Sequence, residues 1–346
     1  MWWGPLNNVT VPTVVPLSVN FLPSWWHQRY GIEFGERWVT DADYRVATLT
    51  EMVRLLFDCF GDVGLGDRDP GPQLALFDLQ NASIPAILGC EVSYPSDNYP
   101  WSYHLPEHRL ASIALREDWV EQFPVRELIA QAQYLSSRYD EPVFPTWNLQ
   151  GVQNVAVLLG GTDFFIAYHD TPDLAHHLLQ IAATAIHASV DFMSNVGSLP
   201  DPVTHANCTA IMVSPSHFRR WLLPYEFELY EHATRLCSHY AIHHCGVADR
   251  YLPVYRQLPT VTWLELGTGS DVRLAQRTFK EAHCQLIVSA TLMRDAQPKE
   301  VAQHIRELVA SVPDLGRFSI SIPDLDHDTP DENVRAAIET AMTHVQ

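Results

Sequence analysis

Two side chains that can hold a metal ion stand two residues apart in the segment Ala241-Ile242-His243-His244-Cys245-Gly246. The apolar residues before them predict a strand over 240–245, and side chains two apart on a strand share a face. Imidazole nitrogen and thiolate sulfur are the usual zinc ligands, and a catalytic zinc site needs three protein ligands and an open position. We therefore expect His243 and Cys245 to face one metal site. Because the chain has 17 histidines and six cysteines, a packed or hydrogen-bonded pair is the alternative.

The elements that would position this pair can be read from an alternation of short apolar runs with segments of helical period. Eight strands alternating with helices predict an α/β fold, a single (β/α)8 TIM barrel over residues 1–346. Such barrels carry their active sites in a cleft built by loops at the C-terminal face of the strands, where His243 and Cys245 would lie. The predicted strands are 14–21, 74–79, 144–149, 207–213, 240–245, 260–265, 285–290 and 317–322, and the predicted helices are 43–60, 125–137, 172–195, 216–238, 271–281, 297–311 and 331–344.

Composition excludes several classes of partner. The chain has 22 basic and 41 acidic residues and a net charge of −19, so nucleic acid and anionic membrane surfaces are not expected partners. No apolar run reaches the roughly 18 residues of a membrane-spanning helix. The segment Met1-Trp2-Trp3-Gly4-Pro5 does not begin an export signal, so we expect a cytoplasmic protein. The six cysteines are spread singly, which is not the pattern of a disulfide framework.

The surroundings of the pair resemble the uroporphyrinogen-decarboxylase superfamily along most of the chain. In motif the chain is most similar to the zinc-dependent branch, which transfers methyl groups between corrinoid proteins and thiols. The resemblance implies the same TIM barrel. The segments that carry it are Phe77-Asp78 with Ile84 to Val92, Gly151 to Asn154 through Gly161 to Phe165 and Asp170-Thr171-Pro172, Ser214-Pro215-x-x-Phe218 with Leu223-Pro224-Tyr225 before His-x-Cys-Gly, and Asp328-Thr329-Pro330-Asp331-Glu332-Asn333-Val334.

This chain differs from that branch at the position of the third metal ligand. There, a cysteine just before the terminal Thr-Pro motif supplies it, whereas here Pro323 stands at the expected position. Carboxylates and imidazoles also bind zinc, so Glu265 and Asp324 join His243 and Cys245 as the expected metal ligands. Asp326 and His327 are further candidates, with helix capping as the alternative for the acidic stretch. Cys208 could also reach the metal, although core packing is the simpler interpretation.

The decarboxylase branch relies on an aspartate that binds pyrrole N–H groups and on arginines that pair substrate carboxylates. Asp78 is the nearest equivalent of that aspartate, but two extra residues separate it from Pro85, and without a gap Gln80 occupies the position. The N-terminal region offers only Arg29 and Arg37. A chain of charge −19 is a poor host for a porphyrinogen with many carboxylates.

Substrate-binding residues are expected in segments that look like loops: 61–73, 93–107 and Trp25 to Gly31. Their aromatic side chains would either line the cleft or pack the loops against the barrel rim. The aromatic residues are Trp25, Trp26, Tyr30, Tyr94, Tyr99, Trp101 and Tyr103. The residues that we expect to bind substrate are Trp26, Arg29, Tyr30, Tyr103 and Asn148.

Three functions remain open. In the first, zinc on His243 and Cys245 activates a thiol that takes a methyl group from methylcobalamin on a corrinoid carrier protein, with Asp78 as a catalytic residue that orients the acceptor or takes up a proton. In the second, a metal-free decarboxylase or lyase acts on a smaller carboxylate through Asp78 and Arg29. In the third, catalysis is lost and the barrel binds a corrinoid carrier. Decarboxylase-like relatives often form homodimers, so the resemblance also implies a possible homodimer.

Overall fold

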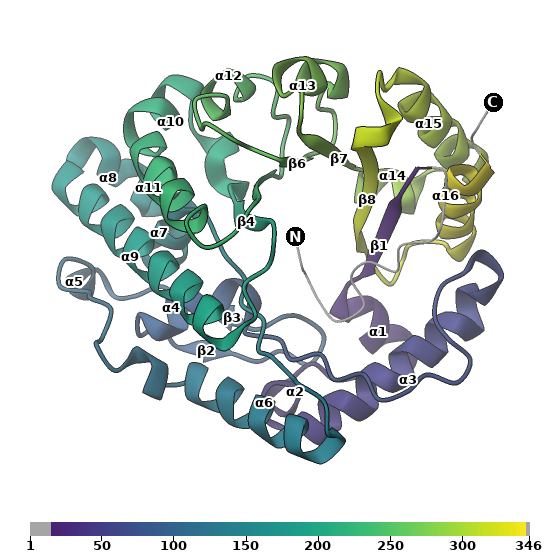
Figure 1. Cartoon of the computed structure of the whole chain (residues 1–346), viewed down its shortest axis with the longest axis horizontal. Helices are drawn as coiled ribbons and strands as arrows, with labels where there is room; N and C mark the ends of the chain where they lie inside the picture. Colours follow the sequence, from purple (N-terminus) through teal and green to yellow (C-terminus); the bar gives the residue numbers. More distant parts are fainter. Residues whose placement is uncertain (1–14, 344–346) are drawn as a thin grey trace.

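A curled parallel sheet forms the centre of the molecule. The structure, a computed structural model, describes residues 15–343. The sheet has six strands in the order β1-β8-β7-β6-β5-β4, and Figure 1 shows the helices arranged outside it. All five neighbouring pairs are parallel, as crossover connections through helices require. The strands are β1 (Leu17–Phe21), β4 (Val203–Ala206), β5 (Tyr240–His244), β6 (Trp263–Leu266), β7 (His283–Ile287) and β8 (Phe318–Leu325).

Two of the eight predicted strands are reduced to single bridges in the described part of the chain. Segments 74–79 and 144–149 contribute single parallel bridges, Leu76 to Pro145 and, just after the second segment, Gln150 to Ala206. Proline has no N–H for a strand ladder, and the N–H groups of Gln80 and Asn148 donate to the Asp78 carboxylate, as described below. The α/β class and the parallel sheet are confirmed. The structure shows a curled sheet of six strands, consistent with a TIM-like barrel.

Two further predictions are corrected. The predicted strand 207–213 is wrong, because β4 ends at Ala206 and a 3-10 turn, Cys208–Met212, follows it. The predicted loop from Trp25 to Gly31 is helix α1 (Pro23–Tyr30). Proline in its first turn and Gly31 in a left-handed conformation (φ 68°) at its end are typical helix boundaries, and both tryptophans of the helix are buried.

Each predicted helix is present with similar bounds, and the structure adds the unpredicted helices α1, α2, α4, α5, α7, α8, α12 and α14. The predicted helix 216–238 is divided at Leu222 into α10 and α11, where Pro224 opens the second helix. Helix α9 packs between α7 and α11, and a short antiparallel ribbon of β2 (Val92–Ser93) and β3 (Trp101–Ser102) lies in the predicted loop 93–107. The helices are α2 (Glu36–Thr40), α3 (Ala42–Phe60), α4 (Ser83–Ile87), α5 (Glu107–Leu110), α6 (Val125–Tyr139), α7 (Val152–Gly160), α8 (Phe164–Asp170), α9 (Pro172–Val196), α10 (Pro215–Trp221), α11 (Leu223–Ala233), α12 (Leu252–Tyr255), α13 (Val272–Thr278), α14 (Ala290–Asp295), α15 (Pro298–Ser311) and α16 (Asp331–Thr343).

Within residues 15–343 no helix has the length and apolar character needed to cross a membrane. Three parts of the predicted features lie outside the described residues. They are residue 14 of the predicted strand 14–21, residue 344 of the predicted helix 331–344, and the segment Met1 to Pro5.

The fully buried Asn333 of α16 ties this last helix to α14. Its Nδ2 donates to the carbonyls of Met293 and Ala296, both at 2.8 Å. We expect Asn333→Ala to lower the free energy of unfolding by about 2–3 kcal/mol, because it leaves two buried carbonyls without their donor. Urea unfolding measures this change. The exposed Asn195→Ala on α9 is the matched control, and equal stability of the two variants would contradict the assigned role.

Candidate metal centre and substrate cavity

Three potential metal ligands meet at the C-terminal end of β4 and β5. One ligand atom each from Cys208, His243 and Cys245 lies within 4.8 Å of the others. His243 is buried near the end of β5 and Cys245 follows that strand, with Nε2 of the imidazole 2.7 Å from the Cys245 sulfur. The intervening His244 points to the other face, where its Nδ1 lies 2.8 Å from the Tyr255 hydroxyl, as strand alternation requires.

Cys208 reaches this point because β4 pairs with β5. Ala206 is in register with His243, and the Asn207 backbone N–H donates to the His243 carbonyl at 2.9 Å. The next residue, Cys208, begins the 3-10 turn above the strand end. The signal for Cys208 in the sequence is its place directly after a short strand, but the predicted strand 207–213 begins where β4 has already ended and so misplaces that position.

Glu265 lies behind the imidazole. It is in register with His243 on the adjacent strand β6, and its Oε2 is 2.7 Å from Nδ1 of His243, with both side chains buried. Burial is the largest single influence and lowers the pKa of His243, but Glu265 and Cys208 together outweigh it and raise that pKa to about 9. Nδ1–H therefore donates to Glu265, and Nε2 is the nitrogen that faces the sulfurs.

The two thiols are electrostatically coupled. A hydrogen bond from Cys245 is the largest cause that lowers the pKa of Cys208, and His243 lowers it further. The same contact raises the pKa of Cys245, since its proton is shared with a thiolate. The pair thus gives up its first proton readily and its second with difficulty. A divalent cation would favour loss of both.

Glycines let the surrounding backbone approach closely. A Cβ on Gly267, after β6, would lie 1.8 Å from the Cys245 carbonyl oxygen, and one on Gly151 would lie 2.2 Å from the Asn207 side-chain oxygen. The contact at Gly267 is too short for any other residue without a backbone shift, and a side chain at Gly151 would require at least the Asn207 side chain to move. Glycine at these positions therefore permits the close packing around the three ligand atoms.

The other predicted metal ligands lie outside this group of three. Asp324 is near the exposed end of β8, where His243 lowers its pKa although burial raises it more. Pro323, at the position expected for the family cysteine, offers its carbonyl to the Asn20 side chain at 2.7 Å. Asp326 and His327 form a separate exposed cluster with Asp328.

A cavity of about 490 Å3 lies inside the curled sheet, and we call it the barrel cavity. Its wall includes Glu265 on one side and Asp78, Gln80 and Asn148 on the other. The cavity therefore reaches the rear of the metal-ligand group through Glu265. Its volume lies within the range of about 300–1,000 Å3 that is typical of small-molecule sites.

The Asp78 carboxylate is occupied by the protein itself. Oδ1 accepts the Gln80 backbone N–H at 2.9 Å, and Oδ2 accepts the Ser83 hydroxyl at 2.7 Å and the Asn148 backbone N–H at 2.6 Å. Burial raises the pKa of Asp78 to about 6 even though these hydrogen bonds lower it. Asp78 thus fixes the turn that follows the bridge at Leu76, which explains why this segment leaves the strand ladder.

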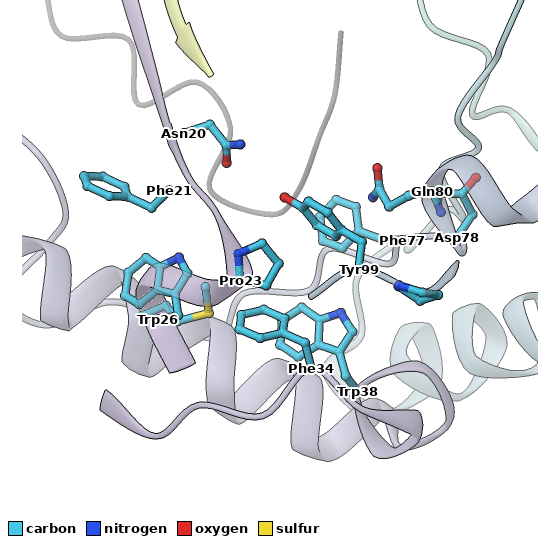
Figure 2. Close-up of a pocket in the computed structure, with 12 residues that line it drawn as sticks. Asn20, Phe21, Pro23, Trp26, Phe34, Trp38, Phe77, Asp78, Gln80 and Tyr99 are labelled. Carbon is cyan, nitrogen blue, oxygen red and sulfur yellow. Dashed lines mark hydrogen bonds between the residues drawn. The ribbon is translucent and has the colours of Figure 1, made fainter. Parts of the chain in front are cut away.

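The expected substrate-binding residues are dispersed. Trp26 lines a small recess beside the barrel cavity together with Asp78 and Gln80 (Figure 2). Arg29 pairs with Asp331 at 2.5 Å. The Tyr30 hydroxyl lies 2.7 Å from the Cys59 sulfur, and Tyr103 is 57% exposed. Of the five, Trp26 and Asn148 line one of these two cavities.

The sequence profile described as Uroporphyrinogen decarboxylase (URO-D) matches residues 76–344, which is most of the chain. The chain belongs to the uroporphyrinogen decarboxylase family. This family is an enzyme family, and the matched region contains the three ligand residues and the barrel cavity's polar wall. No curated protein matches the chain.

Two solved structures are similar to this chain. A methyltransferase from Methanosarcina mazei has a TM-score of 0.67 and 17% identity, over 96% of this chain and 94% of that one. A B12-independent methionine synthase from Shewanella sp. W3-18-1, in complex with selenomethionine, has a TM-score of 0.49 and 12% identity, over 96% of each chain. The first similarity shows a shared fold.

A buried acid beneath Cys208 gives the site a pH-dependent stability. Glu226 of α11 accepts from the Asn207 side chain at 3.2 Å, and burial raises its pKa from 4.5 to about 7. Between these values the folded protein keeps a proton that the unfolded chain has lost, so the contribution of Glu226 to stability falls as the pH rises.

We therefore expect Glu226→Gln to gain stability relative to the parent protein between pH 5 and pH 8, by up to about 3 kcal/mol. Urea unfolding at both pH values measures the difference. Glu231→Gln, on the exposed face of the same helix, should not alter the pH profile. A constant difference between Glu226→Gln and the parent protein would show that Glu226 ionises as freely in the folded state.

Proposed function

We propose that this chain is a zinc-dependent methyltransferase that moves a methyl group between a corrinoid and a thiol. The observation that carries the proposal is the convergence of Cys208, His243 and Cys245 at the end of β4 and β5. Three protein ligands of nitrogen and sulfur are the number and type that catalytic zinc sites use, with a fourth position left for a substrate.

The residues fit a zinc ion in a second respect. Glu265 holds Nδ1 of His243, and a carboxylate behind a metal-binding imidazole fixes its tautomer and orientation. The Asn207 side chain, held by Glu226, similarly supports the start of the turn that carries Cys208. His243 therefore has a carboxylate partner of the kind that known zinc sites use, and the turn that carries Cys208 is held by a buried hydrogen bond.

Zinc at this position would supply positive charge that lowers the pKa of a substrate thiol, which is otherwise mostly protonated at neutral pH. In the proposed reaction the carbon–cobalt bond of methylcobalamin breaks, its electron pair stays on cobalt, and the methyl carbon joins sulfur while the thiol proton is released. Cys208, His243 and Cys245 would hold the ion, and Glu265 orients His243. The exposed side of Cys245 is where a corrinoid carrier protein would present its cofactor.

The metal-free decarboxylase has less support. All hydrogen bonds of Asp78 described above come from the protein, and Arg29 is paired with Asp331. No lysine or arginine is among the described residues that line the barrel cavity, whereas a carboxylate substrate needs a cation. The occupied Asp78 carboxylate, the paired Arg29 and the lack of a cation in this lining therefore all count against the decarboxylase and favour methyl transfer.

Metal analysis of the purified protein tests the proposal. We expect stoichiometric zinc in the parent protein and its loss in Cys208→Ala, His243→Ala and Cys245→Ala, because two ligands hold the ion far less tightly than three. Cys237→Ala is the matched control, since this cysteine lies outside the ligand group. Full zinc in Cys208→Ala would contradict the three-ligand site, and unchanged methylcobalamin absorbance on addition of thiols would contradict the reaction.

Glu265→Gln tests the outer partner separately. The variant keeps the size of the side chain but removes the charge that stabilises His243, so we expect about 10–100-fold weaker zinc affinity with the three ligands intact. Competition with a chelator measures the affinity. Zinc binding as tight as in the parent protein would mean that Glu265 only fills space.

A further inference from the structure

Two cysteines from different strand ends lie next to each other in the metal-ligand group. Cys208 follows β4 and Cys245 follows β5, and their sulfurs lie within 4.8 Å of each other. A disulfide needs a sulfur–sulfur bond of about 2.05 Å, which two cysteines can form only when their backbones are already close. Whether this pair can be joined therefore depends on how firmly the two backbones are held together.

The turn that carries Cys208 is tied to the segment after β5 by hydrogen bonds that do not involve the ligand atoms. The Tyr251 hydroxyl donates to the carbonyl of Ala210 at 2.9 Å. The Arg250 guanidinium donates to the carbonyl of Ile211 at 3.2 Å. Both acceptors belong to the 3-10 turn Cys208–Met212. Because the chain makes these bonds by itself, the two backbones stay close without an ion.

Two glycines show how tightly the Cys245 backbone is enclosed. A Cβ on Gly246 would lie 2.5 Å from Cγ2 of Ile211, so the residue after Cys245 packs directly against the turn. A Cβ on Gly267 would lie 1.8 Å from the Cys245 carbonyl oxygen. With both backbones fixed, rotation of the two cysteine side chains is the main movement that a disulfide would require.

The six cysteines differ in their access to solvent. Cys245 is exposed and Cys208 is partly buried, whereas Cys90 and Cys284 are buried. The partly buried Cys237 thiol donates to two backbone carbonyls. Oxidation of thiols follows their exposure, and it leads to a disulfide where a second thiol stands beside the first. A soluble oxidant therefore meets Cys245 first, and Cys208 is the thiol beside it.

We propose that Cys208 and Cys245 are a redox modification site, at which a hydroperoxide joins them in a reversible disulfide. The disulfide takes two of the three ligand atoms from the metal and leaves His243 alone. Formation of the bond does not depend on the proposed function. Only its consequence, the release of zinc and the loss of methyl transfer until the bond is reduced, rests on that function.

The reaction with hydrogen peroxide proceeds in two steps. The Cys245 sulfur attacks one peroxide oxygen, so that a sulfur–oxygen bond forms, the oxygen–oxygen bond breaks and water leaves. The Cys208 sulfur then attacks the sulfur of this sulfenic acid, so that the disulfide forms, the sulfur–oxygen bond breaks and a second water leaves with the thiol proton. The two sulfurs lose two electrons in total and the peroxide gains them. A dithiol reductant reverses the result by thiol–disulfide exchange.

Peptide mapping of the peroxide-treated full-length protein tests the proposal. We expect mass spectrometry without reductant to find a disulfide between the peptides that contain Cys208 and Cys245. The protein should lose two of its six thiols, and dithiothreitol should restore both. The treatment is made on the protein as purified and again after removal of metal with a chelator, because a bound ion would slow the oxidation.

Matched variants make the result specific. Cys237→Ser should form the same linked peptide as the parent protein, because this cysteine lies outside the ligand group. Cys208→Ser should not lose a pair of thiols, since Cys245 then has no partner beside it. Absence of the linked peptide from the parent protein under both conditions would overturn the proposal, and so would loss of a pair of thiols at the same rate in Cys208→Ser.

Zinc content separates this inference from the proposed function. We expect peroxide to release the zinc of the parent protein in step with the loss of two thiols, as a metallochromic chelator measures. A protein that forms the disulfide but contains no zinc would contradict the proposed function and leave the modification site standing. A protein that contains zinc, but whose two cysteines stay reduced in peroxide even after the zinc is removed, would do the reverse.

Discussion

The parallel register between β4, β5 and β6 determines the geometry of the whole site. Ala206 is paired with His243, and His243 with Glu265, so the ends of three adjacent strands lie side by side. Strand spacing alone then brings the Cys208 sulfur to one side of the imidazole and the Glu265 carboxylate to the other. A slip of one residue in either pairing would turn these side chains to the opposite face and separate them.

A chain of side-chain amides connects the two halves of the site. Asn81 accepts from the side chains of Asn148 and Gln150, Gln150 accepts from Asn154, and Asn154 accepts from the backbone of Thr209, next to Cys208. Because each amide orients the next, the Asp78 turn and the metal-ligand turn are parts of one hydrogen-bonded structure. This network takes the place of the regular strands that 74–79 and 144–149 do not form.

The sequence predicts the grouping of His243 and Cys245 more accurately than it predicts the strands. The spacing of His243 and Cys245 is local, and alternation on a strand was enough to place both in one group. The position of Cys208 depends on the residue at which β4 ends. That residue is hard to predict because apolar residues lie on both sides of it. The turn at Asp78, where Gln80 has a left-handed backbone (φ 56°), is held by a buried carboxylate and has no signature in a single sequence.

The position of Cys208 also determines which parts of the molecule could unfold locally without loss of a bound ion. In the branch that the motifs resemble, the third ligand comes from the last strand, so the ion would bridge distant parts of the chain. Here Cys208, His243 and Cys245 lie on one continuous stretch, 208–245, that contains α10, α11 and β5. An ion held there closes only this short loop, so the terminal helices α15 and α16 can fray or exchange amide hydrogens without releasing it.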